Sequence, residues 1–223
     1  MLLKTNKLMK AFGGLKAINK VDFELPANEI RGIIGPNGSG KSTFFNLVSG
    51  VYEPDPGSYI EFDGKDITNE PPHKVGELGL ARTFQLLRLY QDMSVINNVM
   101  SGYHTLVPYN FIDAVTGRKK IWDQEKVIKE EMMELLSFVG LADYAELNAS
   151  ELSGGQRRLL VLARAIAGKP KLLMLDEPAA GLSPVNVDNL MKILMRLKEK
   201  YGLTLIIIEH ILKVVMDTCS KVT

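Results

Sequence analysis

Hydrophobic positions form two different patterns along this chain: short continuous apolar runs, and apolar residues at helical spacing. Three short apolar runs predict buried strands: EIRGII (29–34), KLLMLDEP (171–178) and LTLIIIEH (203–210). The segment between the last two has apolar residues at the spacing of one helical face, namely Leu190, Ile193, Leu194 and Leu197. Strands this hydrophobic, alternating with helices, predict a parallel sheet that is covered on both faces.

The middle of the chain shows only the helical spacing of apolar residues. From about Asp92 to Gly168 no convincing strand occurs, and apolar residues fall at helical spacing: Val127, Ile128, Met132, Leu135, Leu136 and Val139. The simplest organisation is one domain, residues 1–223, with an α/β core at about 1–91 and 169–223. We expect a helical lobe at about 92–168 to interrupt that core.

The composition is that of an ordinary folded protein. Of 223 residues, 46% are hydrophobic and 24% are charged, and 27 basic residues nearly balance 26 acidic ones. A formal charge of +1 provides no electrostatic reason to expect a nucleic-acid partner. Cys219, the single cysteine, cannot form an internal disulfide, which fits a cytosolic compartment. No apolar run approaches the roughly 18 residues that a membrane span needs, and no secretory signal is expected.

A glycine-rich loop follows the first predicted strand. Gly35, Gly40, Lys41 and Ser42 in GPNGSGKST (35–43) fit the phosphate-binding pattern GxxxxGK[ST] between a strand and a helix. Its glycines let backbone N–H groups surround phosphates, and the positive end of the helix starting near Lys41 faces them. Lys41 is expected to reach the outer phosphates, and the Ser42 hydroxyl to ligate Mg²⁺. This loop predicts a nucleoside triphosphate, but it fits a kinase, a GTPase or an ATPase.

Charged pairs end the other two predicted strands. Asp176 and Glu177 follow one apolar run, and Glu209 and His210 follow the next. Because parallel strands bring their carboxyl ends to one edge of the sheet, His210 is expected near the phosphates. One carboxylate of the first pair can face Mg²⁺ through water while the other polarises an attacking water.

A second glycine loop, SGGQ (153–156), opens a predicted helix in the middle of the chain. Folded onto its own P-loop, it would compete for the same triphosphate. On the outside of the lobe, it could meet the P-loop of a second copy, where Ser153, the N–H groups of Gly154 and Gly155, and the helix N-terminus would cap the γ-phosphate. Taken alone, LSGGQ also fits an ordinary serine-capped helix start. Together with the P-loop, it predicts a site split between two subunits.

In this order, the motifs resemble the ATP-binding cassette family, the nucleotide-binding subunits of membrane transporters. GPNGSGKST is similar to the Walker A loop, LLMLDE to the Walker B strand and LSGGQ to the signature sequence. Gln85 in ARTFQ matches the Q-loop, His210 the switch histidine, and Phe12 the aromatic residue that stacks on adenine. FGGLKAINKVDFEL, GLARTFQ, SVINNVM and DEPAAGLSP resemble the branch serving branched-chain amino acid importers.

The resemblance implies a fold and a set of site residues. The fold is an α/β P-loop NTPase with a mainly parallel core sheet, an N-terminal antiparallel β part and an inserted helical lobe. The ligands are ATP and Mg²⁺, with Mg²⁺ near Ser42, Gln85 and Asp176. Glu177, His210 and Gln85 are the implied catalytic residues. The implied nucleotide-binding residues are Phe12, Gly35, Asn37, Gly38, Ser39, Gly40, Lys41, Ser42, Thr43, Ser153, Gly154, Gly155 and Gln156.

The resemblance also implies partners and a location. Two nucleotide-binding subunits, identical or closely paralogous, would close around two ATP molecules and drive transport through separate transmembrane permease subunits. This places the chain at the cytoplasmic face of the cell membrane, as part of an importer of branched-chain or other hydrophobic amino acids. The same motifs fit the ATPase of an exporter or a soluble ATPase without a transport role, and the residues leave both alternatives open.

Overall fold

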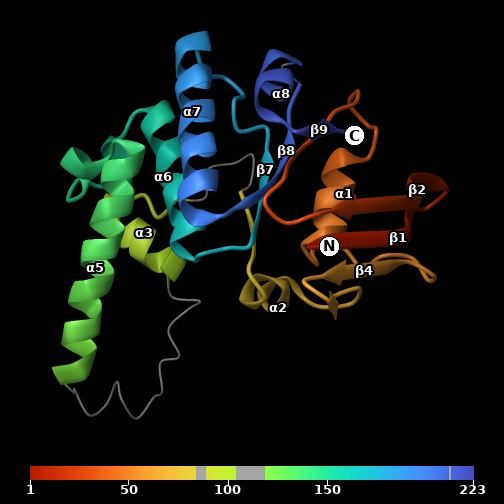
Figure 1. The fold of residues 1–223 in the computed structure, drawn as a ribbon, viewed down its shortest axis with the longest axis horizontal. Coiled ribbons are helices and arrows are strands. Elements are labelled where there is room, and N and C mark those ends of the chain that lie inside the picture. Colours follow the sequence, from red (N-terminus) through yellow and green to blue (C-terminus); the bar gives the residue numbers. More distant parts are fainter. Residues whose placement is uncertain (84–88, 104–118, 211) are drawn as a thin grey trace. The chain divides into compact units, whose positions relative to one another are not determined.

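The computed structural model of this chain describes residues 1–83, 89–103, 119–210 and 212–223. The chain divides into two compact units, and each is described by itself. Unit 1 consists of Met1–Gln85 and Pro170–Thr223, and unit 2 consists of Leu86–Lys169. Figure 1 shows the elements of both units in sequence colours.

The centre of unit 1 is a five-stranded parallel sheet. Its strand order is β6 (Leu80–Arg82), β7 (Leu172–Asp176), β8 (Thr204–Ile208), β3 (Ile30–Ile33) and β9 (Lys221–Val222). Asp176 and Ile33 both pair with Ile208, so β7, β8 and β3 end at the same level. Every residue of β8 is buried, as expected for a parallel strand that is covered on both faces. The predicted α/β core is confirmed.

The described residues of unit 1 form the helices α1 (Lys41–Val48), α2 (Pro72–Glu77), α7 (Pro184–Tyr201) and α8 (Leu212–Thr218). Three of the four residues that predict one face of α7 are buried, namely Leu190, Leu194 and Leu197, and Ile193 is half-buried. Proline at the first position of α7 and left-handed Gly202 at its end are typical helix boundaries. In the described part of the chain, no helix is long and apolar enough to span a membrane.

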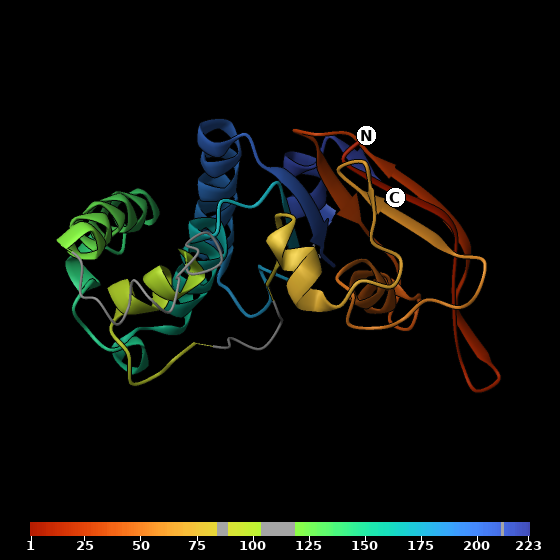
Figure 2. The ribbon, with the colours of Figure 1, turned by 90° about the horizontal axis from the view of Figure 1, so that it is seen from below.

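An antiparallel sheet completes unit 1. Its strand order is β2 (Leu15–Leu25), β1 (Leu3–Phe12), β4 (Tyr59–Phe62) and β5 (Lys65–Asp66). Figures 1 and 2 both show α1 beside this sheet. Phe44 and Phe45 of α1 belong to one buried cluster with Leu3, Phe62 and Ile206, so the helix after the P-loop joins the two sheets through the core.

Unit 2 is helical. It contains α3 (Val95–Tyr103), α5 (Lys119–Val139) and α6 (Gly154–Ala167), together with the 3₁₀ turns η2 (Ala142–Tyr144) and η3 (Ala149–Glu151). Helices α3 and α6 approach closely, because a Cβ atom at Gly102 would lie 2.0 Å from the carbonyl oxygen of Arg164. Among the α5 side chains whose burial is described, residues 126–139, the first buried one is Met132, whereas Val127 is 63% exposed.

Candidate functional site

The P-loop connects β3 to α1 with the backbone geometry that its glycines predict. Gly40 precedes α1 with φ +94°, a left-handed conformation that side chains rarely adopt. A Cβ atom there would also lie 2.5 Å from the carbonyl oxygen of Ala17, so glycine is required. Asn37, Gly38 and Ser39 are exposed, which leaves the backbone of the loop accessible to an anion at the start of the helix.

Lys41 is the buried cation of this loop. Its side chain is on the first residue of α1, and the residue is only 9% exposed. Its ammonium group donates to the carbonyl oxygens of Gly35 at 2.8 Å and Pro36 at 2.9 Å. These bonds use two of its three N–H donors and hold the charge inside the loop. A cation and backbone N–H groups at a helix N-terminus fit a phosphate chain.

The carboxyl ends of β7 and β8 bring Glu177 and His210 together. Oε1 of Glu177 lies 2.8 Å from Nε2 of His210, with the side chains 24% and 41% exposed. Because an ionised carboxylate only accepts hydrogen bonds, the Nε2–H tautomer of His210 is the one that can donate to an ionised Glu177. Two groups that can accept and donate protons therefore meet at the same sheet edge as the P-loop.

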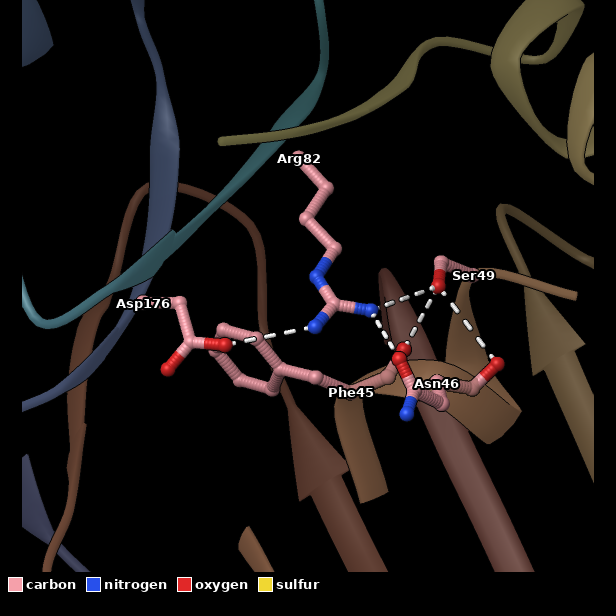
Figure 3. Close-up of polar contacts among 5 residues, drawn as sticks. All are labelled: Phe45, Asn46, Ser49, Arg82 and Asp176. Carbon is pink, nitrogen blue, oxygen red and sulfur yellow. Dashed lines mark hydrogen bonds and ion pairs between the residues drawn. The ribbon is translucent and has the colours of Figure 1, made fainter. Parts of the chain in front are cut away.

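Asp176, the last residue of β7, is held by Arg82, a residue to which no sequence motif assigns a role. Nη2 of Arg82 lies 3.2 Å from Oδ2 of Asp176, and Nη1 donates to Asn46 of α1 at 2.6 Å (Figure 3). Burial lowers the pKa of the Arg82 guanidinium, against the opposing effect of Asp176. The oxygen atoms of Asp176 and Ser42 are donors of the kind that Mg²⁺ prefers, so this set fits the metal.

Phe12 lies at the end of β1, where the chain turns into β2. The residue is 45% exposed, and its ring centroid is 5.4 Å from that of Tyr52 at an interplanar angle of 73°. Lys10 Nζ lies 5.7 Å from the centre of the Phe12 ring. An exposed aromatic ring supported at its edge by another ring is suited to stacking on a flat base.

The signature residues belong to unit 2. Ser153 is the N-cap of α6, its Oγ accepts from Gln156 N, and Gln156 Oε1 accepts from Ser153 N at 2.9 Å. This capping box is the ordinary helix start that LSGGQ also predicts. Ser153 and Gly154 are exposed at the helix N-terminus, so they remain accessible to another molecule. Gln85, the expected Q-loop residue, lies outside the described residues.

Unit 1 thus brings together Gly35, Lys41, Asp176, Glu177 and His210, while Ser153–Gln156 lies in unit 2. No sequence motif assigns a role to Arg82 or Glu209, although both contact this site: the Arg82 side chain is 8% exposed and Glu209 is 2% exposed. A charged residue inside or directly after a buried strand is the signal that could identify such positions. The role of each such residue depends on its partner far away in the sequence, and the spacing of residues along the chain does not reveal that partner.

Comparisons with known proteins agree with this geometry. The family described as ABC transporter matches residues 18–180. The branched-chain amino acid transport ATP-binding protein BraF of Pseudomonas aeruginosa is 36% identical over 99% of this chain and 86% of its own. The probable branched-chain amino acid transport ATP-binding protein LivG of Archaeoglobus fulgidus is 41% identical over 96% of this chain and 82% of its own.

Solved structures agree as well. The ADP conformation of MJ1267, an ATP-binding cassette of an ABC transporter, superposes with a TM-score of 0.83 at 34% identity. The similarity covers 98% of this chain and 84% of that one. A nucleotide-free cassette from an ABC transporter superposes with a TM-score of 0.82 at 33% identity, over 98% of this chain and 85% of that one. The chain therefore belongs to the ABC transporter family, in which it is an ATP-binding cassette that hydrolyses ATP.

Proposed function

We propose that residues 1–223 work as one ABC ATPase domain that powers import of branched-chain or other hydrophobic amino acids. The observation that carries this proposal is the similarity to BraF and LivG, both named for branched-chain amino acid transport. The two alignments extend over 96–99% of this chain, so the similarity includes unit 2 as well as the P-loop. A P-loop alone would support ATP binding without indicating what is transported.

In this proposal the P-loop binds the triphosphate and Phe12 stacks on adenine. The backbone of Gly35, Asn37, Gly38, Ser39 and Gly40 surrounds the phosphates, together with the side chains of Lys41, Ser42 and Thr43. The support is the exposure of the loop backbone and the buried ammonium of Lys41 within it. The charge of Lys41 and the dipole of α1 act together on the same anion.

Mg²⁺ is the proposed metal, with Ser42, Asp176 and Gln85 as the residues that hold it directly or through water. When bound, Mg²⁺ neutralises charge that develops on the phosphate oxygens. Ser42 is exposed at the second position of α1, and Asp176 is fixed at the end of β7 by Arg82.

Glu177 is the proposed catalytic carboxylate, and His210 its partner, with Gln85 the third catalytic residue. Glu177 accepts a hydrogen bond from the attacking water, orients it and draws its proton. Nε2 of His210 lies 2.8 Å from Glu177 Oε1 in this structure, and its N–H can donate to a phosphate oxygen in place of that contact. The two residues supply an acceptor for the nucleophile and a donor for the developing negative charge.

The site is proposed to be completed by the signature of a second nucleotide-binding subunit, either a second copy or a close paralogue. Ser153, Gly154, Gly155 and Gln156 would face the γ-phosphate held by the partner's P-loop. The supporting observation is that Ser153 and Gly154 are exposed at the N-terminus of α6, a helix of 14 residues. Closure of the dimer around two ATP molecules is then driven by contacts that exist only in the closed state.

Transmembrane permease subunits are the proposed membrane partners, which places the chain at the cytoplasmic face of the cell membrane. A decisive experiment deletes the gene and measures uptake of radiolabelled leucine after complementation. The wild-type chain is expected to restore uptake, and Glu177→Gln is expected not to. Glutamate uptake in the same cells is the control. Normal leucine uptake in the deletion strain, or loss of export with normal uptake, would contradict the importer assignment.

A further inference from the structure

We propose that Glu209 is a positioning residue. It fixes the backbone of the turn that carries Glu177 by binding that turn on its buried side. This inference rests on the proposed role of Glu177 in hydrolysis. Glu209 directly follows β8 and is only 2% exposed. A carboxyl group is costly to bury unless hydrogen bonds compensate for the lost water. Its partners therefore show what the buried position serves.

Two of those partners are backbone N–H groups next to the catalytic pair. Oε1 of Glu209 accepts from the N–H of Ala179 at 2.7 Å, and this bond is buried. Oε2 accepts from the N–H of His210 at 3.3 Å. Ala179 stands two residues after Glu177 and is itself 1% exposed. One carboxyl group thus joins the turn after β7 to the residue that contacts Glu177.

The turn that carries Glu177 has a backbone conformation that needs such support. Glu177 has φ +49°, a left-handed conformation that is uncommon for a residue with a side chain. Its own N–H donates to the carbonyl oxygen of Ile208 at 2.9 Å, and the N–H of Ala180 donates to the Glu177 carbonyl at 3.1 Å. The turn is therefore tied to β8 on both sides of Pro178, by Ile208 on one side and Glu209 on the other.

Burial shows that two neighbouring residues act on Glu177 from different directions, because Glu209 is buried and His210 is exposed. Glu209 points into the protein and binds the backbone of the turn, while His210 points outward and reaches the Glu177 carboxylate at 2.8 Å. Glu209 sets where the backbone of Glu177 lies, and His210 contacts its side chain.

The test uses three substitutions of Glu209 in the full chain. Glu209→Ala removes the acceptor, Glu209→Asp keeps the charge on a shorter side chain, and Glu209→Gln keeps an acceptor oxygen at the same reach. The matched control is Glu29→Ala. Glu29 lies just before β3, at the opposite edge of the sheet, is 10% exposed and accepts from Arg31 Nε at 2.7 Å. It is therefore a carboxyl group of similar burial that lies far from the turn.

We expect Glu209→Ala to lower kcat roughly tenfold to a hundredfold, since small misplacements of a catalytic group have effects of that size. ATP affinity, measured with EDTA and a fluorescent ATP analogue, should stay within about twofold, so the loss appears in kcat and not in KM. Glu209→Gln should recover most of the rate, and Glu209→Asp should fall between them. Glu29→Ala should leave kcat unchanged. If Glu209→Ala does not fold, the Asp and Gln variants decide the comparison.

A double variant separates positioning from general destabilisation. If Glu209 acts through Glu177, adding Glu209→Ala to Glu177→Gln should reduce the residual rate no further. A multiplied loss, a parallel loss of ATP affinity, or a wild-type rate in Glu209→Ala or Glu209→Asp would overturn the inference. If Glu177→Gln itself hydrolyses ATP normally, the proposed role of Glu177 fails first. If only Glu177→Gln is inactive, the proposed function stands and the inference about Glu209 fails.

Discussion

Arg82 of β6 and Asp176 of β7 form an ion pair inside unit 1, with 3.2 Å between Nη2 and Oδ2. The side chains are 8% and 10% exposed. The same guanidinium donates to Asn46 and Ser49 and lies 5.4 Å from the centre of the Phe45 ring (Figure 3). One buried cation therefore joins the last residue of β7 to the helix that follows the P-loop.

Removal of this cation should destabilise unit 1. Arg82→Ala leaves the Asp176 carboxylate buried without its partner, and the expected loss in unfolding free energy is about 3 kcal/mol. Urea denaturation followed by circular dichroism measures it. Lys171→Ala is the matched control, because Lys171 pairs with Asp63 in the same unit at 55% and 47% exposure. That exposed pair should contribute far less than the buried one, because water and salt screen it. Equal losses would contradict the buried pairing.

Glu177→Gln should bind ATP normally and almost stop hydrolysis. The amide keeps the size of the side chain but cannot take a proton from water. We expect an ATP-bound dimer to accumulate, which gel filtration with and without ATP measures. Glu70→Gln, an exposed carboxylate of unit 1, should behave as wild type. Normal turnover in Glu177→Gln would assign the catalytic base elsewhere.

Lys41→Ala should weaken ATP binding by about 1–3 kcal/mol, the usual contribution of a charge-assisted hydrogen bond to an anion. Equilibrium binding of a fluorescent ATP analogue measures it. Lys65→Ala, at an exposed lysine of β5, is the control and should bind ATP as wild type does. Because Lys41 also binds two P-loop carbonyls, thermal unfolding should accompany the measurement. Unchanged affinity in a folded variant would argue against the P-loop assignment.

Ser153→Arg should spare ATP binding by the monomer, because the P-loop and Phe12 belong to unit 1. It should abolish ATP-dependent dimerisation, since a long side chain would enter the space meant for the γ-phosphate. Steady-state hydrolysis should fall with it. Gel filtration and phosphate release measure the two effects. Loss of nucleotide binding in the isolated monomer would show that the signature serves its own P-loop.

Mixing Ser153→Arg with Lys41→Ala provides the sharper test of a shared site. In a mixed dimer both changes fall on one composite site, and the other site pairs an intact P-loop with an intact signature. ATP-driven dimer and some hydrolysis should return in the mixture, although neither variant alone supports them. Each variant mixed with itself is the control. An inactive mixture would count against sites shared between chains.

Cys219 should react slowly with alkylating reagents in the folded chain. Burial, with a smaller contribution from the charge of Glu209, raises the pKa of its thiol from 9.0 to about 11. Because the thiolate is the nucleophile, labelling at pH 8 should be roughly a hundredfold slower than for a thiol of ordinary pKa. The rate should rise with pH up to about 11. Iodoacetamide labelling in native buffer and in urea measures it, and equal rates would contradict the raised pKa.

By itself, the sequence determined the elements whose information is local. The apolar runs at β7 and β8 and the helical spacing in α7 predict those elements, because burial on one or both faces imposes a period. The P-loop could also be predicted from the sequence, because the backbone conformation of the loop itself requires glycine at position 40. These features depend on neighbours in the chain, and their bounds agree with the predicted strands within a few residues.

Only the tertiary structure decided which distant groups meet. Arg82 and Asp176 stand 94 positions apart, and Ala179 and Glu209 stand 30 apart. Their contacts depend on strand order and on the register that places Asp176 opposite Ile208. A pattern of hydrophobic positions predicts which face of a strand is buried, but many registers and strand orders satisfy it. Packing of the whole sheet selects one of them, and that selection gives Arg82 and Glu209 their partners.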